Sequence, residues 1–335
     1  SNDTGAGIII SGVTQGTFGT VVITGGGTGL TYQPTPNFHG TDVFTYTITD
    51  ANGATATAGV LVNVAASNDA PVLNLPVPQT IRANTVTTIN GIFVNDSDAL
   101  QGDGLLEITL AVQNGTLTLS TLAGVFFAVG DGVSDRTMQF TGSLPSVTAA
   151  LSGLIYKPNA DTLEPDLISV NVSDLGNTGA GGVLTASGNL ALNPLENQIV
   201  VQPNPLSSKL QDLVIYGKSS SDDKILIKGG GTTFKVSLDG GATFLPSFKK
   251  VSGRILVFGL SGNDEIKMPK VGRIGILSGG VGNDTLEGGS KNDRLSGGAD
   301  QDSLIGGKGI DRLVESANGD FTLIDGSLSG ALGND

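Results

Sequence analysis

Cysteine is absent from the 335-residue chain, and histidine occurs once, as His39. Without cysteine, neither disulfide bonds nor thiolate metal sites are available, so the fold must be held by its core or by another metal. A single histidine excludes the paired-histidine zinc motif His-Glu-x-x-His, and no Gly-x-Ser-x-Gly motif accompanies it. His39 also lies in a turn-like stretch, residues 36–40. We therefore expect no catalytic centre and predict that the chain is not an enzyme.

Long apolar runs and positive charge are also scarce. No run approaches the roughly 18 apolar residues that span a bilayer. The chain carries 18 Lys and Arg against 31 Asp and Glu, a formal net charge of −13. This balance argues against nucleic acid or an anionic membrane as a partner, and it suits hard cations as well as solubility. No signal peptide is visible and the chain opens at Ser1, so we expect a mature or excised piece.

Glycine, by contrast, is abundant, with 51 residues. The glycine-rich stretches at residues 25–29 and 229–231 lack the Gly-Lys-Ser/Thr sequence of a phosphate-binding loop. They lie between segments with β-strand patterns, so we interpret them as hairpin turns.

Residues 1–66 alternate with a period of two. Phe44, Tyr46 and Ile48 share one face of a strand, and three valines at positions 60, 62 and 64 repeat the pattern. The sequence Asp-Ala-Asn-Gly at residues 50–53 has hairpin-turn chemistry. The pattern predicts half-buried antiparallel strands.

This first region resembles the bacterial cadherin-like, immunoglobulin-like repeats of large surface proteins. The resemblance rests on Tyr-Gln-Pro at residues 32–34, on residues 36–42 and 44–46, and on residues 50–53. It implies a β-sandwich whose opening strand is missing before Ser1. Either the chain was cut there, or a strand from another molecule completes the sheet.

Residues 67–71 form a short polar linker that ends in Pro71, and residues 72–194 form a second β unit. Leu106, Ile108 and Leu110 alternate there. One helix is expected after Pro145, because apolar residues then recur at three- and four-residue spacing. This unit resembles a longer cadherin-like repeat through residues 114–117, 144–158 and 172–174.

Residues 195–278 are again rich in β-strand patterns, with strands expected at residues 214–216, 224–228, 234–238 and 255–258. Two segments, residues 221–223 and 262–266, resemble degenerate copies of a motif that becomes regular after Gly279. We interpret residues 195–278 as the run-in to a repeat region at 279–314, and residues 315–335 as a C-terminal cap.

The repeat region places two glycines, an aspartate and a leucine in the same slots of four successive nonapeptides. The acidic slot holds Asp284, Asp293, Asp302 and Asp311. The apolar slot holds Leu286, Leu295, Leu304 and Leu313. The pattern resembles the RTX, or haemolysin-type, calcium-binding repeat. The fold class expected for the whole chain is therefore all-β: two immunoglobulin-like or cadherin-like sandwiches, then a β-rich unit that ends in a parallel β-roll.

Two nonapeptides make one coil of a parallel solenoid, so repeats two apart stack on the same edge. Asp284 then lies over Asp302, and Asp293 lies over Asp311. Stacked carboxylates repel each other, so we expect a loose or unfolded stack without a cation. Ca²⁺ takes about 6–8 oxygen ligands, which aspartates and turn carbonyls can supply.

The candidate ligands on the first edge are Asp284, Asp302, Asp300, Gly280, Gly282 and Gly298. Those on the second edge are Asp293, Asp311, Gly289, Gly307 and Gly309. Lys291 and Asp300 replace the glycine of the fourth slot, so we expect tighter binding on the edge that holds Asp300. Asp264 lies 20 residues before Asp284, two more than one coil, and is a further but weaker candidate.

Cadherin-like repeats often hold calcium where two domains join. The candidates for such a joint are Asp69, Asp96, Asp98, Asp103 and Asp174, although aspartates are also ordinary turn formers.

The leading functional hypothesis is a calcium-dependent structural and adhesive segment of a large bacterial protein that is secreted or held at the cell surface. Its partners would be calcium, neighbouring domains or further copies, and a cell-surface or matrix ligand. Two alternatives remain: a filament or S-layer subunit completed by strand exchange, and the non-catalytic tail of a secreted RTX enzyme.

Overall fold

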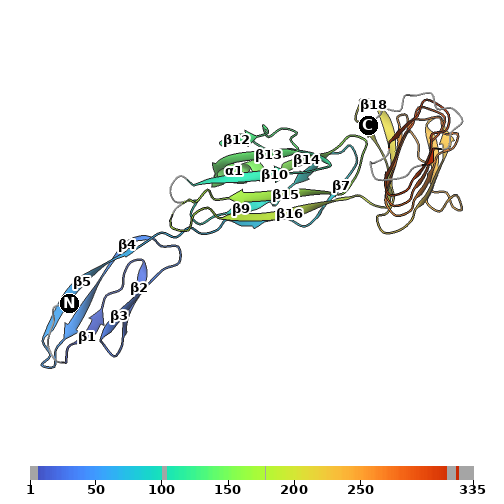
Figure 1. Ribbon diagram of the computed structural model, residues 1–335. Helices are drawn as coiled ribbons and strands as arrows, with labels where there is room; N and C mark the ends of the chain where they lie inside the picture. Colours follow the sequence, from blue (N-terminus) through green and yellow to red (C-terminus); the bar gives the residue numbers. More distant parts are fainter. Residues whose placement is uncertain (1–6, 100–103, 178, 315–321, 324–335) are drawn as a thin grey trace.

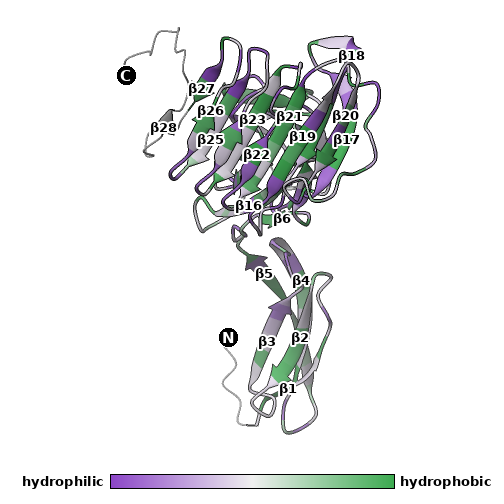
Figure 2. Cartoon of the chain, turned by 90° about the vertical axis from the view of Figure 1, so that its right-hand side faces the viewer, coloured by the Kyte–Doolittle hydropathy of each residue, from purple (hydrophilic) through white to green (hydrophobic). Residues whose placement is uncertain are grey.

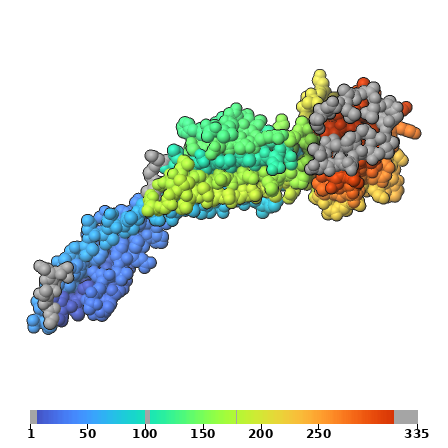
Figure 3. All heavy atoms as spheres, viewed as in Figure 1, coloured from blue at the N-terminus to red at the C-terminus, as the bar shows by residue number. Residues whose placement is uncertain are grey.

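The computed structural model describes residues 7–99, 104–177, 179–314 and 322–323. They form three β-rich bodies in a row: a first domain (residues 7–64), a middle domain (72–194) and a roll (198–314) (Figures 1 and 3). The predicted all-β class is confirmed, with one short helix. In the part of the chain that the structure describes, no helix has both the length and the apolar character needed to cross a membrane.

The first domain contains five strands in two small sheets. One sheet has the order β1-β4-β5 and the other pairs β2 with β3. Their bounds are β1 Ile9–Val13, β2 Gly19–Thr24, β3 Gly29–Pro34, β4 Gly40–Thr49 and β5 Thr55–Val64. The predicted turn at residues 50–53 joins β4 to β5, because Asp50 Oδ1 accepts the N–H groups of Asn52 and Ala54.

The core of the first domain is thin. Among its described residues, two hydrophobic side chains, Val21 and Phe44, are buried. The inward-facing Val60, Val62 and Val64 of β5 are only half-buried. This domain therefore buries little apolar surface for its length.

The middle domain has a sheet of order β12-β13-β10-β15-β16-β7, a sheet of order β11-β14-β8 and a β6–β9 pair. The large sheet comprises β7 Gln79–Ile81, β10 Leu105–Ala111, β12 Val125–Val129, β13 Thr137–Ser143, β15 Asp166–Ser173 and β16 Thr185–Pro194. The others are β6 Val72–Asn74, β8 Thr87–Ile89, β9 Phe93–Asn95, β11 Gly115–Thr118 and β14 Leu154–Pro158.

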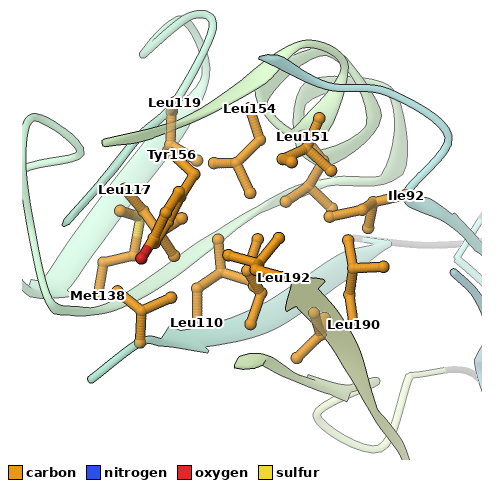
Figure 4. Close-up of a cluster of buried hydrophobic side chains, with 14 of the residues drawn as sticks. Ile92, Leu110, Leu117, Leu119, Met138, Leu151, Leu154, Tyr156, Leu190 and Leu192 are labelled. Carbon is orange, nitrogen blue, oxygen red and sulfur yellow. The ribbon is translucent and has the colours of Figure 1, made fainter. Parts of the chain in front are cut away.

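A dense apolar core fills the space between these sheets, as Figure 4 shows for Leu110, Leu117 and Leu154 among others. Helix α1, Leu144–Leu151, closes one side with four buried side chains. The predicted helix start is confirmed, since Ser143 caps the helix and Pro145 stands in its first turn.

The roll consists of two sheets whose strands alternate along the chain (Figure 2). The first roll sheet comprises β17 Gln198–Asn204, β18 Ser207–Tyr216, β21 Ile255–Ser261, β23 Gly275–Val281, β25 Arg294–Ala299 and β27 Arg312–Val314. The second comprises β20 Thr233–Ser237, β19 Lys224–Gly230, β22 Glu265–Lys267, β24 Thr285–Glu287, β26 Ser303–Ile305 and β28 Thr322–Leu323.

Successive coils pair in parallel, as the nonapeptide pattern predicts. Leu286 pairs with Leu304 and Leu295 pairs with Leu313. The first three of these leucines, in chain order, are buried in the roll interior and Leu313 packs against them. Parallel pairing starts well before the regular repeats, at β18 with β21. Residues 195–278 thus contribute coils of the same solenoid.

Candidate metal centre

One edge of the roll carries a column of buried aspartates, where strands of the first roll sheet lead into strands of the second. We call it the Asp264 edge; its column is Asp223, Asp264, Asp284 and Asp302. The N–H of each aspartate donates to Oδ1 of the aspartate one coil later, at 2.7, 2.7 and 2.8 Å. These bonds hold the carboxylates in line across the coils.

The predicted stack of Asp284 over Asp302 is part of this column, and Asp264 lies in line with it. Asp264 was expected to fit less well because of its 20-residue spacing. Lys267 pairs with Glu287, 20 residues further on, whereas Ile276 pairs with Arg294, 18 residues further on, so the two extra residues lie between Lys267 and Ile276, at the opposite edge. The Asp264 edge is therefore undisturbed.

The second oxygen of Asp264 has an environment suited to a cation. Oδ2 is buried and makes no hydrogen bond to the described part of the chain. A Cβ atom added to Gly259 would lie 2.2 Å from this oxygen and 2.6 Å from the Gly279 carbonyl oxygen. A carboxylate oxygen and a carbonyl oxygen therefore converge on the same bare backbone. Hard cations such as Ca²⁺ prefer such oxygen ligands.

The electrostatics of the column also favour a cation. Burial raises the pKa of the Asp264 carboxyl to about 6, the N–H of Asp223 opposes the rise, and the carboxylates of Asp223 and Asp222 add to it. The metal-free stack thus disfavours its own charge, and a bound cation would remove that penalty. The residues present fit calcium.

The turns of this edge require left-handed backbone at two slots. Gly280 and Gly298 occupy one slot with φ of 118° and 117°. Gly282 and Asp300 occupy the other, with φ of 122° and 79°. Asp300 thus takes the conformation of the glycine it replaces, and its side chain is exposed beside the column.

A second column of amide groups runs beside the aspartates, and the sequence reasoning missed it. Asn263 Oδ1 accepts the N–H of Asn283 at 2.8 Å, and Asn283 Oδ1 accepts the N–H of Gln301 at 2.9 Å. Asp222 Oδ1 accepts the N–H of Asn263 in the same way. The available signal was the Asn-Asp pair at residues 263–264 and again at 283–284.

The opposite edge, here the Asp293 edge, holds the other predicted pair. Asp293 N–H donates to Asp311 Oδ1 at 2.8 Å. Asp293 itself accepts the N–H of Gly275 at Oδ1 and that of Gly289 at Oδ2, both at 2.6 Å. Burial raises the pKa of Asp293 to about 6, against the effect of these donors. Both its oxygens already have protein donors, so this edge fits a cation less well than the Asp264 edge.

The remaining glycines of the Asp293 edge pack tightly between coils. Gly307 and Gly309 have φ of 93° and 130°. A Cβ on Gly307 would lie 2.4 Å from the Gly289 carbonyl oxygen, and a Cβ on Gly309 would lie 2.4 Å from that of Lys291. The predicted turn glycines are thus fixed by the close approach of neighbouring coils.

The linker brings some of the joint candidates together. The N–H of Asp69 donates to Asp98 Oδ2, and the N–H of Asp98 donates to Asp96 Oδ1. Asp96 Oδ2 is buried without a hydrogen bond to any described residue. Asn68 Nδ2 donates to the buried Asp174. The linker is thus bound to the middle domain by its own polar groups.

Asp103 lies outside the described residues. Within the described ranges, no three His, Cys, Asp or Glu side chains gather as a metal-binding group. Any calcium site here therefore depends on backbone carbonyls as well as on pairs of aspartates.

Both sandwich domains share a Tyr–Asp pair that sequence reasoning did not single out, fully buried in the middle domain and with a half-buried tyrosine in the first domain. Tyr32 Oη donates to Asp42 at 2.8 Å, and Tyr156 Oη donates to Asp166 at 2.9 Å. Each carboxylate also accepts three backbone N–H groups. In both cases the tyrosine starts a Tyr-x-Pro sequence ten residues before the aspartate. These hydrogen bonds give the pair a structural role within each domain rather than a role in binding a ligand.

Two family models match parts of this chain. Residues 1–63 match the model of the bacterial Ig domain. Residues 278–313 match the model of the RTX calcium-binding nonapeptide repeat, in four copies. The resemblances predicted for the first region and for the nonapeptides, and calcium as the expected ligand, are thereby confirmed. No curated protein matches the chain.

Solved structures with detectable likeness include cadherin repeats. Human protocadherin-24 EC1-2 is 12% identical, with 58% of this chain and 85% of that chain covered and a TM-score of 0.32. Drosophila N-cadherin EC1-4 is 13% identical, with 77% and 68% covered and a TM-score of 0.30. Mouse cadherin-23 EC22-24 is 14% identical, with 76% and 69% covered and a TM-score of 0.30. Scores of this size do not establish a common fold.

Proposed function

We propose that this chain is a calcium-stabilised structural and adhesive segment of a bacterial protein that is secreted or held at the cell surface. The observation that carries the proposal is the buried column of the Asp264 edge, where Asp264 Oδ2 and the Gly279 carbonyl oxygen both lie close to Gly259. The bacterial Ig domain and the RTX repeats support an extracellular setting.

Asp264, Asp284 and Asp302 would hold calcium together with turn carbonyls, including those of Gly280 and Gly282. Bound calcium supplies the positive charge that lets these carboxylates stack. The N–H of Asp223 fixes Oδ1 of Asp264, while Oδ2 of Asp264 is buried without a hydrogen bond to the described part of the chain. Because calcium binds the folded roll, it stabilises the roll by RT ln(1 + [L]/Kd), about 2.7 kcal/mol for each site at 100 times Kd.

The mechanical consequence is a roll whose rigidity depends on extracellular calcium. At low calcium the coils would separate under carboxylate repulsion, and at millimolar calcium they would close. Domains of these matched types are typically non-catalytic, which agrees with the absence of catalytic motifs in the sequence.

Thermal unfolding with and without calcium tests the proposal. We expect calcium, and not an equal concentration of magnesium, to raise the melting temperature of the roll by several degrees, since about 1 kcal/mol shifts Tm by roughly 2–8 °C. Magnesium is the matched control because it demands shorter bonds and a stricter octahedron. A melting curve that chelator leaves unchanged would contradict the proposal.

A second candidate function is assembly by strand exchange, which the first domain supports. Strand β5 lies at the edge of its sheet, and its inward valines are half-buried. An edge with unsatisfied backbone groups and partly exposed apolar residues can accept a further strand from a second copy. Light scattering over a range of protein concentration, with calcium present, tests this; a monodisperse monomer at the highest concentration would contradict it.

A further inference from the structure

The first coil of the roll neutralises one of its buried acids, Asp212, with an arginine. Asp212 is fully buried in β18. Its Oδ2 accepts Nε and Nη2 of Arg254 at 3.2 and 3.0 Å, and its Oδ1 accepts the Arg254 backbone N–H at 2.6 Å. Asn204 Nδ2 donates to both oxygens. Every lone-pair direction of this carboxylate thus meets a protein donor, unlike Asp264 Oδ2.

Arg254 also reaches across to the middle domain. Its Nη1 donates to Asp161 Oδ2 at 2.7 Å, and its side chain is 12% exposed. Asp161 is already fixed within the middle domain, because Asn84 Nδ2 donates to its Oδ1 and Asn84 Oδ1 accepts its N–H, both at 2.9 Å. The acceptor for Arg254 is therefore held in place by the middle domain itself.

The outward face of the same coil is apolar and covered. Val214, Tyr216, Leu256 and Phe258 are at most 1% exposed and belong to one cluster with the core of the middle domain. The rings of Tyr216 and Phe258 stack at 5.9 Å. Figure 1 shows β18 on the side of the roll where it meets the middle domain.

The apolar outward face ends after the strand that holds Ile276. Leu256 of β21 pairs in register with Ile276 of β23. The same outward position holds Arg294 in β25 and Arg312 in β27. On the Asp264 edge, the first aspartate, Asp223, still has the N–H of Lys218 for its Oδ2. The next aspartate of the column is Asp264, whose Oδ2 has no such donor among the described residues.

We propose that Arg254 does in the first coil what calcium does in the later ones, so that residues 198–258 fold on the middle domain without calcium and present a finished coil on which the calcium-dependent coils assemble. The inference rests on the proposed function for the later coils. Its own content is the calcium-independence of the first coil and the dependence of that coil on Arg254.

Hydrogen exchange by mass spectrometry on the full chain, in chelator and in calcium, tests the proposal. In chelator, peptides from β18 and β21 should be protected like those of β10 and β15, whereas peptides from β24 and β26 should gain about 100-fold protection only on addition of calcium. If β18 and β21 exchange in chelator as fast as β24 and β26, the proposal is wrong.

Substitution of the arginine supplies the second arm. Arg254→Gln leaves Asp212 buried without its cation, so β18 and β21 should lose roughly 100-fold protection in chelator while β10 and β15 keep theirs. Arg273→Gln is the matched control, because that guanidinium donates to the carbonyls of Gly231 and Ser252 and neutralises no acid. Equal protection of β18 and β21 in the two variants would overturn the role of Arg254.

Arg254→Lys keeps a positive charge without the forked geometry. In this variant the protection of β18 and β21 in chelator should lie between that of the wild type and that of Arg254→Gln. Protection no better than that of Arg254→Gln would count against a charge effect. The wild-type comparison decides the question even if the glutamine variant fails to fold. Failure of the proposed function has a different signature, in which β24 and β26 ignore calcium while β18 and β21 stay protected.

Discussion

The backbone N–H of Asp264 donates a 2.7 Å hydrogen bond to Oδ1 of Asp284, one coil further along the roll. This bond places a carboxylate that lies outside the regular nonapeptides in the same column as those inside them. The column of the Asp264 edge therefore extends beyond the region that the repeat model matches, residues 278–313.

Asp264→Asn should remove part of the stabilisation by calcium. The amide keeps the acceptor for the N–H of Asp223 but loses the charge, so we expect the calcium-induced gain in unfolding free energy to fall by about 2–3 kcal/mol, the value of one site near saturation. Urea unfolding with and without calcium measures this. Glu287→Gln, which removes one charge on β24 away from the column, is the control; an equal loss in both variants would show a general charge effect.

Gly279→Ala should weaken calcium binding by steric means. A Cβ at Gly279 would lie 2.0 Å from Asp284 Oδ2, so the carboxylate must move at a cost of about 1–3 kcal/mol. Gly272→Ala is the control: it is the same substitution, but a Cβ there meets no atom within 4 Å. Calorimetric calcium titration compares the two variants. Unchanged affinity in Gly279→Ala would argue against a cation at this turn.

The metal-free roll should lose stability as the pH rises from about 4 to 7. Burial raises the folded-state pKa of Asp264 and of Asp293 to about 6, above the unfolded value of about 3.9. The folded roll then binds more protons than the unfolded chain between these values, so its stability is greatest below the unfolded pKa and falls through the folded pKa.

Calcium competes with these protons, so its stabilising effect should grow over the same interval. Melting temperatures in metal-depleted buffer and in calcium, at pH 5 and pH 7, check both trends. A metal-free roll that is more stable at pH 7 than at pH 5 would contradict the electrostatic account.

Tyr156→Phe should destabilise the middle domain by about 1–3 kcal/mol at any calcium concentration, because a buried carboxylate loses a hydroxyl donor. The Tyr156–Asp166 bond lies within the sandwich, away from both edges of the roll. Tyr46→Phe, on a half-buried side chain of the first domain, is the control. Chemical denaturation followed by far-UV circular dichroism measures the loss; dependence of that loss on calcium would contradict a purely structural role for the pair.

Much of the roll could be predicted from the sequence because its repeats are short and local. The leucines at 286, 295 and 304 and the stacking of Asp284 over Asp302 follow from a period of nine and from parallel coiling. The helix after Ser143 could also be predicted, since a proline start and apolar spacing are local signals.

The first coil could not be predicted in the same way. Its aspartates at 223 and 264 are 41 residues apart, because the β19–β20 hairpin and residues 238–254 interrupt the coil and hide its period. The partner of Arg254 on the middle domain, Asp161, is 93 residues away in sequence. Contacts of this range depend on how two domains dock, which no periodic pattern encodes.

Anomalous diffraction from crystals grown in calcium tests the central claim most directly. The account predicts anomalous peaks on the Asp264 edge, within about 2.3–2.6 Å of carboxylate oxygens of Asp264, Asp284 or Asp302 and of turn carbonyls. Ordered coils with water alone between those carboxylates, and no anomalous signal, would contradict it.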